Sequence, residues 1–370
     1  SFLGTEPVGR LLMRLAVPTV IAQLVNMLYN IVDRIYIGHM PGDGSLALTG
    51  VGVCMPIIMI VTAFAALIAS GGAPRASIAL GRGDRDTAER LLGNCFTLQI
   101  IISLTLTVIL RLFGRSFLLA FGASENTIEY AVNYLNIYAL GTLFVELTLG
   151  MNAFITAQGF ATTGMLTVLI GAVCNIALDP LFIFGLDMGM TGAALATILG
   201  QIASFCISIR YLFHFKSVPF SRDCFTIDGD RTRKIFSYGA SACFNQIAMA
   251  VVQIVLNNTL AHYGALSIYG SDIPLACAGI ISKVNMIFMS FVIGISQGVQ
   301  PIIGFNYGAA LYRRVNRELL HQNNAQYLLY EGFRSELYLQ GVKLYPTFSL
   351  DEDHIRREKA LFEKEIRPFL

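Results

Sequence analysis

Two polar side chains interrupt one of the most apolar stretches of the sequence, residues 162–185. Asn175 and Asp179 stand four residues apart in NIALDP, and Pro180 directly follows the carboxylate. On a helix, residues four apart lie one above the other on the same face. A carboxylate in an apolar segment is costly, and it therefore indicates a functional site. Because Pro180 has no backbone N–H, we expect it to leave a carbonyl oxygen free close to Asp179.

A second polar group runs along the first apolar segment, around NMLYNIVDRIYIG. Its members recur at the spacing of one helix face, and Tyr29 lies one turn before the carboxylate. The members are Gln23, Asn26, Asn30 and Asp33. The carboxylate could instead pair with Arg34 or cap a neighbouring loop, but a stripe of four polar residues facing lipid would be costly.

Three further polar residues fall within apolar segments. Thr197 stands among small residues in GMTGAALATILGQ, and a lone hydroxyl there would be expected to bond back to its own helix. Glu146 in the fourth segment and Lys283 in the eighth are the other charges. Each could be functional, or could have a structural role at the membrane interface or in an ion pair.

The chemistry of these groups points to a small cation. Carboxylate, amide and hydroxyl oxygens are typical ligands of alkali and alkaline-earth cations rather than of zinc or copper. The set could hold Na⁺, or a buried carboxylate could hold a proton. The sequence has no HExxH motif and no GxxxxGK[ST] loop. We therefore predict no enzyme activity and no cofactor beyond Na⁺ or H⁺, and an ion gradient as the energy source.

The elements that would position these residues are long apolar helices. Of the 370 residues, 55% are hydrophobic and only 14% are charged, and the mean hydropathy is +0.62. A soluble chain of this length has more charge, because it must cover its surface. Several runs are long enough to cross a hydrocarbon core of about 30 Å. We predict an all-α polytopic membrane protein with spans at 11–38, 46–72, 88–112, 127–152, 162–185, 190–213, 236–261 and 273–303.

Positive charge falls mainly on alternate connections between these spans. Lys and Arg gather around residues 10–14, 75–90, 210–234 and 313–317, and the opposite connections have few besides Arg111 and Arg115. Because cytoplasmic loops carry the excess of positive charge, we predict a multi-pass protein of the inner or plasma membrane with a cytoplasmic N-terminus. The formal net charge of +2 gives no reason to expect a nucleic-acid partner.

An internal repeat relates residues 70–92 to residues 296–319. Because the second copy belongs to a half that begins after six spans, the halves have parallel orientation, a symmetry found in secondary transporters. The repeat predicts a bundle with a complete six-helix N-lobe and an incomplete C-lobe. Its parts are the N-lobe at 1–213, a basic cytoplasmic linker at 214–235, a partial C-lobe with two helices at 236–319, and a charged cytoplasmic tail of unknown role at 320–370.

Four segments together resemble the multidrug and toxic compound extrusion (MATE) family. They are NIVDRIYIG in the first span, NIALDPLFIFG in the fifth, TGAALATILGQ in the sixth and SQGVQPIIGFNYGA in the repeat. The resemblance implies a cation-coupled antiporter that exports amphipathic or cationic compounds by alternating access between two six-helix lobes. Because the family has twelve helices, we expect this chain to be truncated after the eighth.

The resemblance to the prokaryotic branch also implies roles for individual residues. It implies an N-lobe site for Na⁺ or H⁺ formed by Asp33, Asn175, Asp179 and Thr197, with Tyr29 beside it. We expect the protein to be a monomer in the lipid bilayer. Further residues are expected to line or support the cavity, namely Gln23, Asn26, Asn30 and Glu146.

Two other functions remain open from the sequence. The first is a flippase for lipid-linked substrates, whose cavity would need a cluster of cationic residues for phosphate, whereas only Arg34 and Lys283 lie within spans. The second is a membrane binding protein or a non-transporting remnant, because four helices of the C-lobe are expected to be missing. Ion binding without substrate flux would indicate the second.

Overall fold

The computed structural model describes residues 2–40, 44–213, 225–266 and 272–316. All regular secondary structure in these ranges is helical. Eight of the segments are long and apolar enough to cross a membrane, which confirms the predicted all-α multi-pass fold. The predicted tail at 320–370 and the first half of the predicted linker lie outside the described residues. The helices are α1 (Phe2–Thr5), α2 (Val8–Gly38), α3 (Gly44–Gly81), α4 (Arg85–Ala120), α5 (Ile128–Ala157), α6 (Ala161–Pro180), the π-helix η1 (Leu181–Gly185), α7 (Gly189–Phe213), α8 (Gly229–Ala265) and α9 (Asp272–Gly308).

Several of these helices are longer than the apolar runs that predicted them. α3, α4 and α8 have 38, 36 and 37 residues, whereas about 20 residues cross the hydrocarbon core. At about 1.5 Å per residue, each helix is roughly 55 Å long. The ends of these helices therefore extend beyond the apolar layer, where charged side chains such as that of Arg85 can be hydrated.

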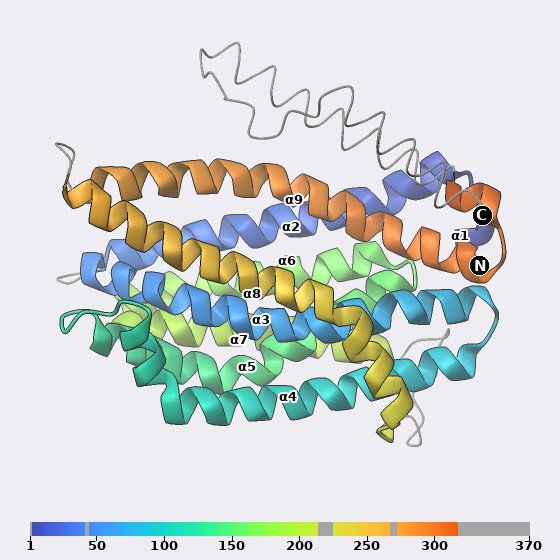
Figure 1. Ribbon diagram of the computed structural model, residues 1–370, viewed down its shortest axis with the longest axis horizontal. Helices are drawn as coiled ribbons and strands as arrows, with labels where there is room; N and C mark the ends of the chain where they lie inside the picture. Colours follow the sequence, from blue (N-terminus) through green and yellow to red (C-terminus); the bar gives the residue numbers. More distant parts are fainter. Residues whose placement is uncertain (1, 41–43, 214–224, 267–271, 317–370) are drawn as a thin grey trace, which may run out of the picture.

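The long helices lie roughly side by side and form one elongated bundle (Figure 1). α2 packs against α6 and α9, α3 packs against α5 and α8, and α5 also contacts α4 and α7. In the most apolar part of α5, 61% of the residues are buried, compared with 17% in α8. α5 is therefore a central helix, and α8 lies at the periphery.

α8 and α3 approach each other closely at Gly239. A Cβ atom added to Gly239 of α8 would collide with the carbonyl of Leu67 on α3, so only glycine allows this spacing. Farther along α8, large apolar side chains are exposed, including Phe244 at 70% and Tyr263 at 66%. The division of the chain into two lobes stays a prediction.

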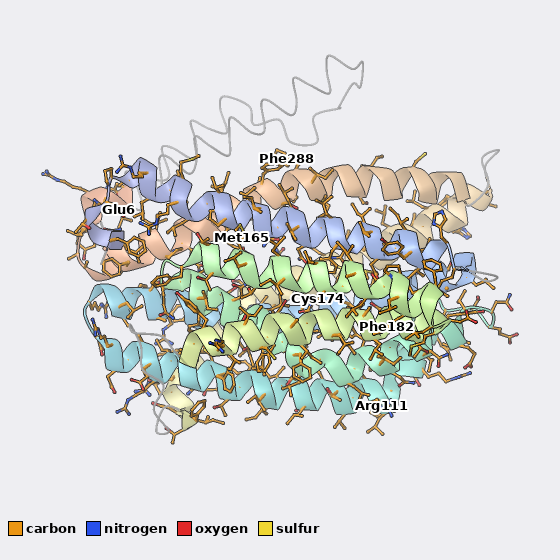
Figure 2. All side chains as sticks on the ribbon, turned by 180° about the vertical axis from the view of Figure 1, so that it is seen from behind. Glu6, Arg111, Met165, Cys174, Phe182 and Phe288 are labelled. Atoms are coloured by element: carbon orange, nitrogen blue, oxygen red, sulfur yellow. The ribbon has the colours of Figure 1, made fainter. Side chains whose placement is uncertain are left out.

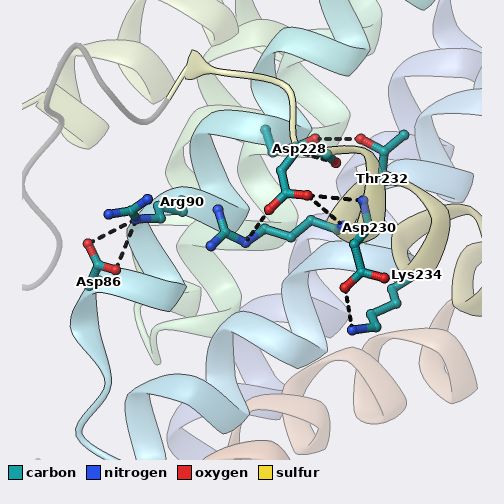
Figure 3. A network of polar contacts seen from close by, with 8 residues as sticks. Asp86, Arg90, Asp228, Asp230, Thr232 and Lys234 are labelled. Atoms are coloured by element: carbon teal, nitrogen blue, oxygen red, sulfur yellow. Dashed lines mark hydrogen bonds and ion pairs between the residues drawn. The ribbon is translucent and has the colours of Figure 1, made fainter.

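α8 begins at Gly229, seven residues before the start predicted at residue 236. The reason is a cap: the Asp228 carboxylate accepts hydrogen bonds from two backbone N–H groups of the first turn, at 3.0 and 3.4 Å. The hydroxyl of Thr232 donates to Asn94 Oδ1 on α4 at 3.3 Å (Figure 3). Part of the segment predicted as a linker is therefore helical and attached to α4.

The short helix α1 is attached to the far end of α9. Asn306 Nδ2 donates to the backbone carbonyl of Leu3 at 3.0 Å, and Arg314 Nη2 donates to the carbonyl of Glu6 at 2.6 Å. Leu3 itself is buried. These contacts join the beginning of the chain to the last part of the described structure.

Candidate cation-binding site

Two carboxyl groups meet between α2 and α6. Asp33 projects from α2 and Asp179 from α6, and the residues are 7% and 0% exposed. Their carboxyl groups lie within hydrogen-bonding reach of each other. A carboxylate has no proton to donate, so a hydrogen bond between the two groups requires that one of them be protonated. Two carboxylates could otherwise share a cation.

Asn175 and Thr197 complete this side of the site. Asn175, 2% exposed, lies one turn before Asp179, and its Nδ2 is 3.4 Å from Asp179 Oδ1 and 3.5 Å from Thr197 Oγ1. The Thr197 hydroxyl donates to the carbonyl of Ala193 in its own helix at 3.0 Å. Its oxygen therefore remains available as an acceptor toward Asn175, or as a ligand.

Three oxygens of this site are buried without a hydrogen-bond partner in the described part of the chain. They are Asp33 Oδ1, Asn175 Oδ1 and Asp179 Oδ2. Arg34 makes no ion pair with Asp33 among the ion pairs of the described residues. Buried acceptors are normally satisfied, so these oxygens fit a cation, and the set is all oxygen. No group of three His, Cys, Asp or Glu suited to a metal occurs in the described ranges.

The local structure around Asp179 explains how these groups are held. α6 ends at Pro180 and continues as the π-helix η1, where the Leu186 N–H bonds to the Leu181 carbonyl at 2.9 Å. Single π turns occur often at functional sites. Gly200 on α7 lies opposite: a Cβ atom there would be 2.7 Å from the Gly171 carbonyl and 3.2 Å from Asn175 Cβ. Glycine at this position therefore sets the distance between α6 and α7. Figure 2 shows α6 and α7 side by side, with Cys174 labelled on α6.

The polar stripe of α2 is divided between two neighbours. Gln23 Nε2 donates to Gln297 Oε1 on α9 at 3.0 Å, and Asn30 Nδ2 donates to the carbonyl of Asn26 at 2.6 Å. Ten residues of helix span about 15 Å, so Gln23 is too far from Asp33 to share one ion with it. Asn26 is exposed. The predicted roles of these three residues in a cavity stay predictions.

Tyrosines that the sequence analysis did not select also approach the site. Tyr134 of α5 lies within hydrogen-bonding reach of Thr197 and close to Asp33. Its ring stacks on Tyr138, with centroids 6.3 Å apart and planes at 12°. Tyr29, which was predicted, lies near both Asp33 and Asp179. The i, i+4 spacing of Tyr134 and Tyr138 could have indicated one polar face of α5.

Of the two remaining charged residues that the sequence placed within spans, the structure describes the side chain of Glu146 but not that of Lys283. Glu146 on α5 is 0% exposed, and neither of its carboxyl oxygens has a partner among the described residues. It forms none of the ion pairs of the described residues, and its functional or structural role stays a prediction. The side chain of Lys283 lies outside the described part of the structure.

Comparison with known proteins identifies the family of the chain. The MatE family model matches residues 18–181 and 241–322, which is more than half of the sequence. The chain belongs to the MATE family. This confirms the resemblance that the four sequence segments indicated, and the family match includes the helices that carry Asp33 and Asp179.

Individual relatives are consistent with this membership. The Multidrug export protein MepA of Staphylococcus haemolyticus (strain JCSC1435) is 28% identical over 297 residues, covering 80% of this chain and 64% of the relative. The protein of the same name from Staphylococcus aureus (strain NCTC 8325 / PS 47) is 28% identical over 307 residues, covering 82% of this chain and 66% of the relative. The MATE chain spans slightly less than two thirds of the length of these curated relatives.

A solved structure shows the same fold. It is described as the outward-facing conformation of a multidrug resistance MATE family transporter of the MOP superfamily. The two chains superpose with a TM-score of 0.82 at 22% identity, covering 91% of this chain and 73% of the other. At this identity the likeness concerns the arrangement of the helices.

Proposed function

We propose that this MATE chain is a cation-coupled exporter of amphipathic or cationic compounds, in which the carboxyl pair Asp33–Asp179 exchanges Na⁺ or H⁺. The proposal is supported by the relatives that are described as multidrug export proteins. It describes a transporter and not an enzyme. We further propose that it is a monomer in the cell membrane, with its N-terminus in the cytoplasm.

The observation that carries the proposal is the contact between two buried carboxyl groups from different helices. The effective penalty for removing one ion from water into a protein interior is several kcal/mol. Two adjacent carboxyl groups cannot both ionise without a compensating charge. A cation must therefore be present whenever both are ionised, and its loss and replacement would change the charge of the site.

The same residues could hold either ion. A proton would lie between Asp33 and Asp179. Na⁺ would be held by oxygens of the two carboxylates, by Asn175 Oδ1 and by Thr197 Oγ1, which are hard ligands of the kind that such cations prefer. Because α2 and α6 each supply one carboxylate, ion exchange would alter the attraction between these helices. That change in helix attraction would couple the binding of the ion to the opening of the substrate cavity.

The test uses the full chain in liposomes loaded with a fluorescent amphipathic cation. A Na⁺ gradient and a pH gradient are imposed separately, so that the coupling ion is identified. We expect gradient-driven efflux to be lost in Asp33→Asn and in Asp179→Asn. Asp187→Asn is the matched control, because it removes an exposed carboxylate eight residues farther along the chain, and it should transport normally.

Two results would contradict the proposal. If both site variants transport like the unmodified chain, the carboxyl pair is not the coupling site. If the chain binds the ion but moves no substrate under either gradient, it is a membrane binding protein rather than an exporter.

A further inference from the structure

A groove lies between α3 and α9, and the two copies of the internal repeat form its walls. Its volume is about 310 Å³ and most of its lining is apolar, which is typical of sites for small molecules. The lining residues of α3 are half-buried, so the groove opens onto the surface of the described structure. The lining includes Pro74 and Ile78 of α3 and Val299, Gln300, Ile303 and Tyr307 of α9.

The shape of the groove is set by the backbones of the two helices. A Cβ atom added to Gly81 of α3 would collide with the Phe305 carbonyl on α9, and one added to Gly308 would collide with the Ile78 carbonyl. Small residues allow helices in a membrane to touch in this way. Because the groove runs beside a direct backbone contact, it is formed before any ligand binds.

The groove runs along the last half of two apolar spans. These candidate spans are Leu46–Gly81 and Asn285–Gly308. At its outer end Tyr307 is 46% exposed, and its ring meets that of Tyr312 edge-on, with centroids 5.8 Å apart. Tyrosine is enriched where the hydrocarbon core meets the lipid headgroups. The groove therefore extends from the hydrocarbon core toward the headgroups.

Positive charge stands at the headgroup end of the groove. Pro74, Ile78 and Arg82 follow one another at four-residue spacing, so Arg82 continues the face of α3 that lines the groove. Its backbone N–H donates to the Ile78 carbonyl at 3.1 Å, which keeps this turn helical. Arg82 is exposed, and so is Arg313, which follows Tyr312. A guanidinium group binds phosphate oxygens with two parallel hydrogen bonds.

We propose that the groove between α3 and α9 binds one anionic phospholipid of the surrounding bilayer, with an acyl chain between the helices and the phosphate at Arg82. The apolar lining takes the acyl chain. The amide of Gln300 and the hydroxyl of Tyr307 can form hydrogen bonds to the ester oxygens. A zwitterionic lipid also carries an ammonium group, which the arginines repel, so the basic end favours a headgroup with net negative charge. This lipid site does not rest on the proposed export function.

The test uses fluorescence quenching by lipids with brominated acyl chains. The chain contains no tryptophan, so Tyr307→Trp introduces a single fluorescent probe at the end of the groove. The full chain is reconstituted in phosphatidylcholine vesicles with increasing fractions of brominated phosphatidylglycerol or of brominated phosphatidylcholine. We expect half-maximal quenching at an about fivefold lower fraction of phosphatidylglycerol, because one arginine near a membrane surface contributes about this factor.

Variants in the probe background assign the preference to the groove. Arg82→Gln should abolish the preference for phosphatidylglycerol, whereas Arg82→Lys should keep most of it because the charge remains. Arg115→Gln is the matched control, since it removes an exposed arginine near the other end of α4, and it should keep the preference. A separate probe, Leu104→Trp, replaces a side chain that is 52% exposed on α4, and both lipids should quench it equally. Helical circular dichroism checks that each variant folds.

Four results would overturn the proposal. Both lipids could quench the Tyr307→Trp probe equally, or the preference could persist in Arg82→Gln. An equally strong preference at the Leu104→Trp probe would show general attraction of anionic lipid rather than a site. No quenching of the Tyr307→Trp probe by either lipid would show that protein, from the same chain or a second copy, fills the groove. None of these measurements uses an ion gradient or an exported substrate, so they can fail independently of the efflux test.

Discussion

The spacing of α6 and α7 should determine the affinity of the cation site, and Gly200→Ala tests this without altering a polar atom. The added Cβ would be 2.7 Å from the Gly171 carbonyl, whereas ordinary contact begins at 3.4 Å. The helices would have to separate by about 0.7 Å, at a cost of roughly 1–3 kcal/mol for overpacking.

This separation acts directly on the contact between Asn175 and Thr197. Their hydrogen-bonding atoms are already 3.5 Å apart, at the long limit for such a bond. A further 0.7 Å would break the contact and withdraw Thr197 from the site. The loss of one neutral interaction of about 1 kcal/mol corresponds to a roughly fivefold weaker affinity.

The assay is the ion concentration that gives half-maximal efflux, measured together with thermal unfolding. Gly52→Ala is the matched control, because a Cβ atom there meets nothing within 4 Å, and it should leave both quantities unchanged. If Gly200→Ala folds and binds the ion with unchanged affinity, then the spacing of α6 and α7 does not set the site, and the reasoning is refuted.

Two further predictions concern the ends of the helices. Asp84 caps α4, and hydrogen bonds from the hydroxyl and backbone N–H of Thr87 hold the pKa of the Asp84 carboxyl below its ordinary value. Asp84→Ala should therefore lower the melting temperature at neutral pH, as measured by thermal unfolding. The difference in melting temperature between the variant and the unmodified chain should shrink as the pH falls below roughly 4, because the Asp84 carboxylate is then protonated. A difference that persists in acid would contradict this. Asn306→Ala should leave the Leu3 carbonyl with fewer donors and destabilise the attachment of α1 by about 1–3 kcal/mol. Limited proteolysis should then cleave the N-terminal segment faster in the variant. Equal cleavage of the variant and the unmodified chain would show that Asn306 does not hold α1 in place.

Much of the local structure could be predicted from the sequence. The helices were predictable because each apolar run is long enough to span a membrane, and a spanning backbone must satisfy its own hydrogen bonds. The pairing of Asn175 with Asp179 was predictable because four-residue spacing fixes it within one helix. The start of α8 was not predictable, because Asp228 caps the helix within a polar segment, where hydrophobic periodicity does not mark the beginning of a helix.

The α2 stripe shows where sequence reasoning stops. Periodicity placed Gln23 and Asp33 on one face, but it could not say that α9 would meet one end of that face and α6 the other. Tyr134 was overlooked because a tyrosine in an apolar run counts as apolar, although its hydroxyl reaches Thr197.

The sequence by itself determined that this chain crosses the membrane as helices and that α2 and α6 each carry a carboxylate at an apolar position. Only the tertiary structure decided that Asp33 meets Asp179 and that Glu146 is fully buried. The reason is physical. Spacing along one helix is set by the geometry of its backbone, whereas the contact between two helices depends on how their side chains and glycines pack.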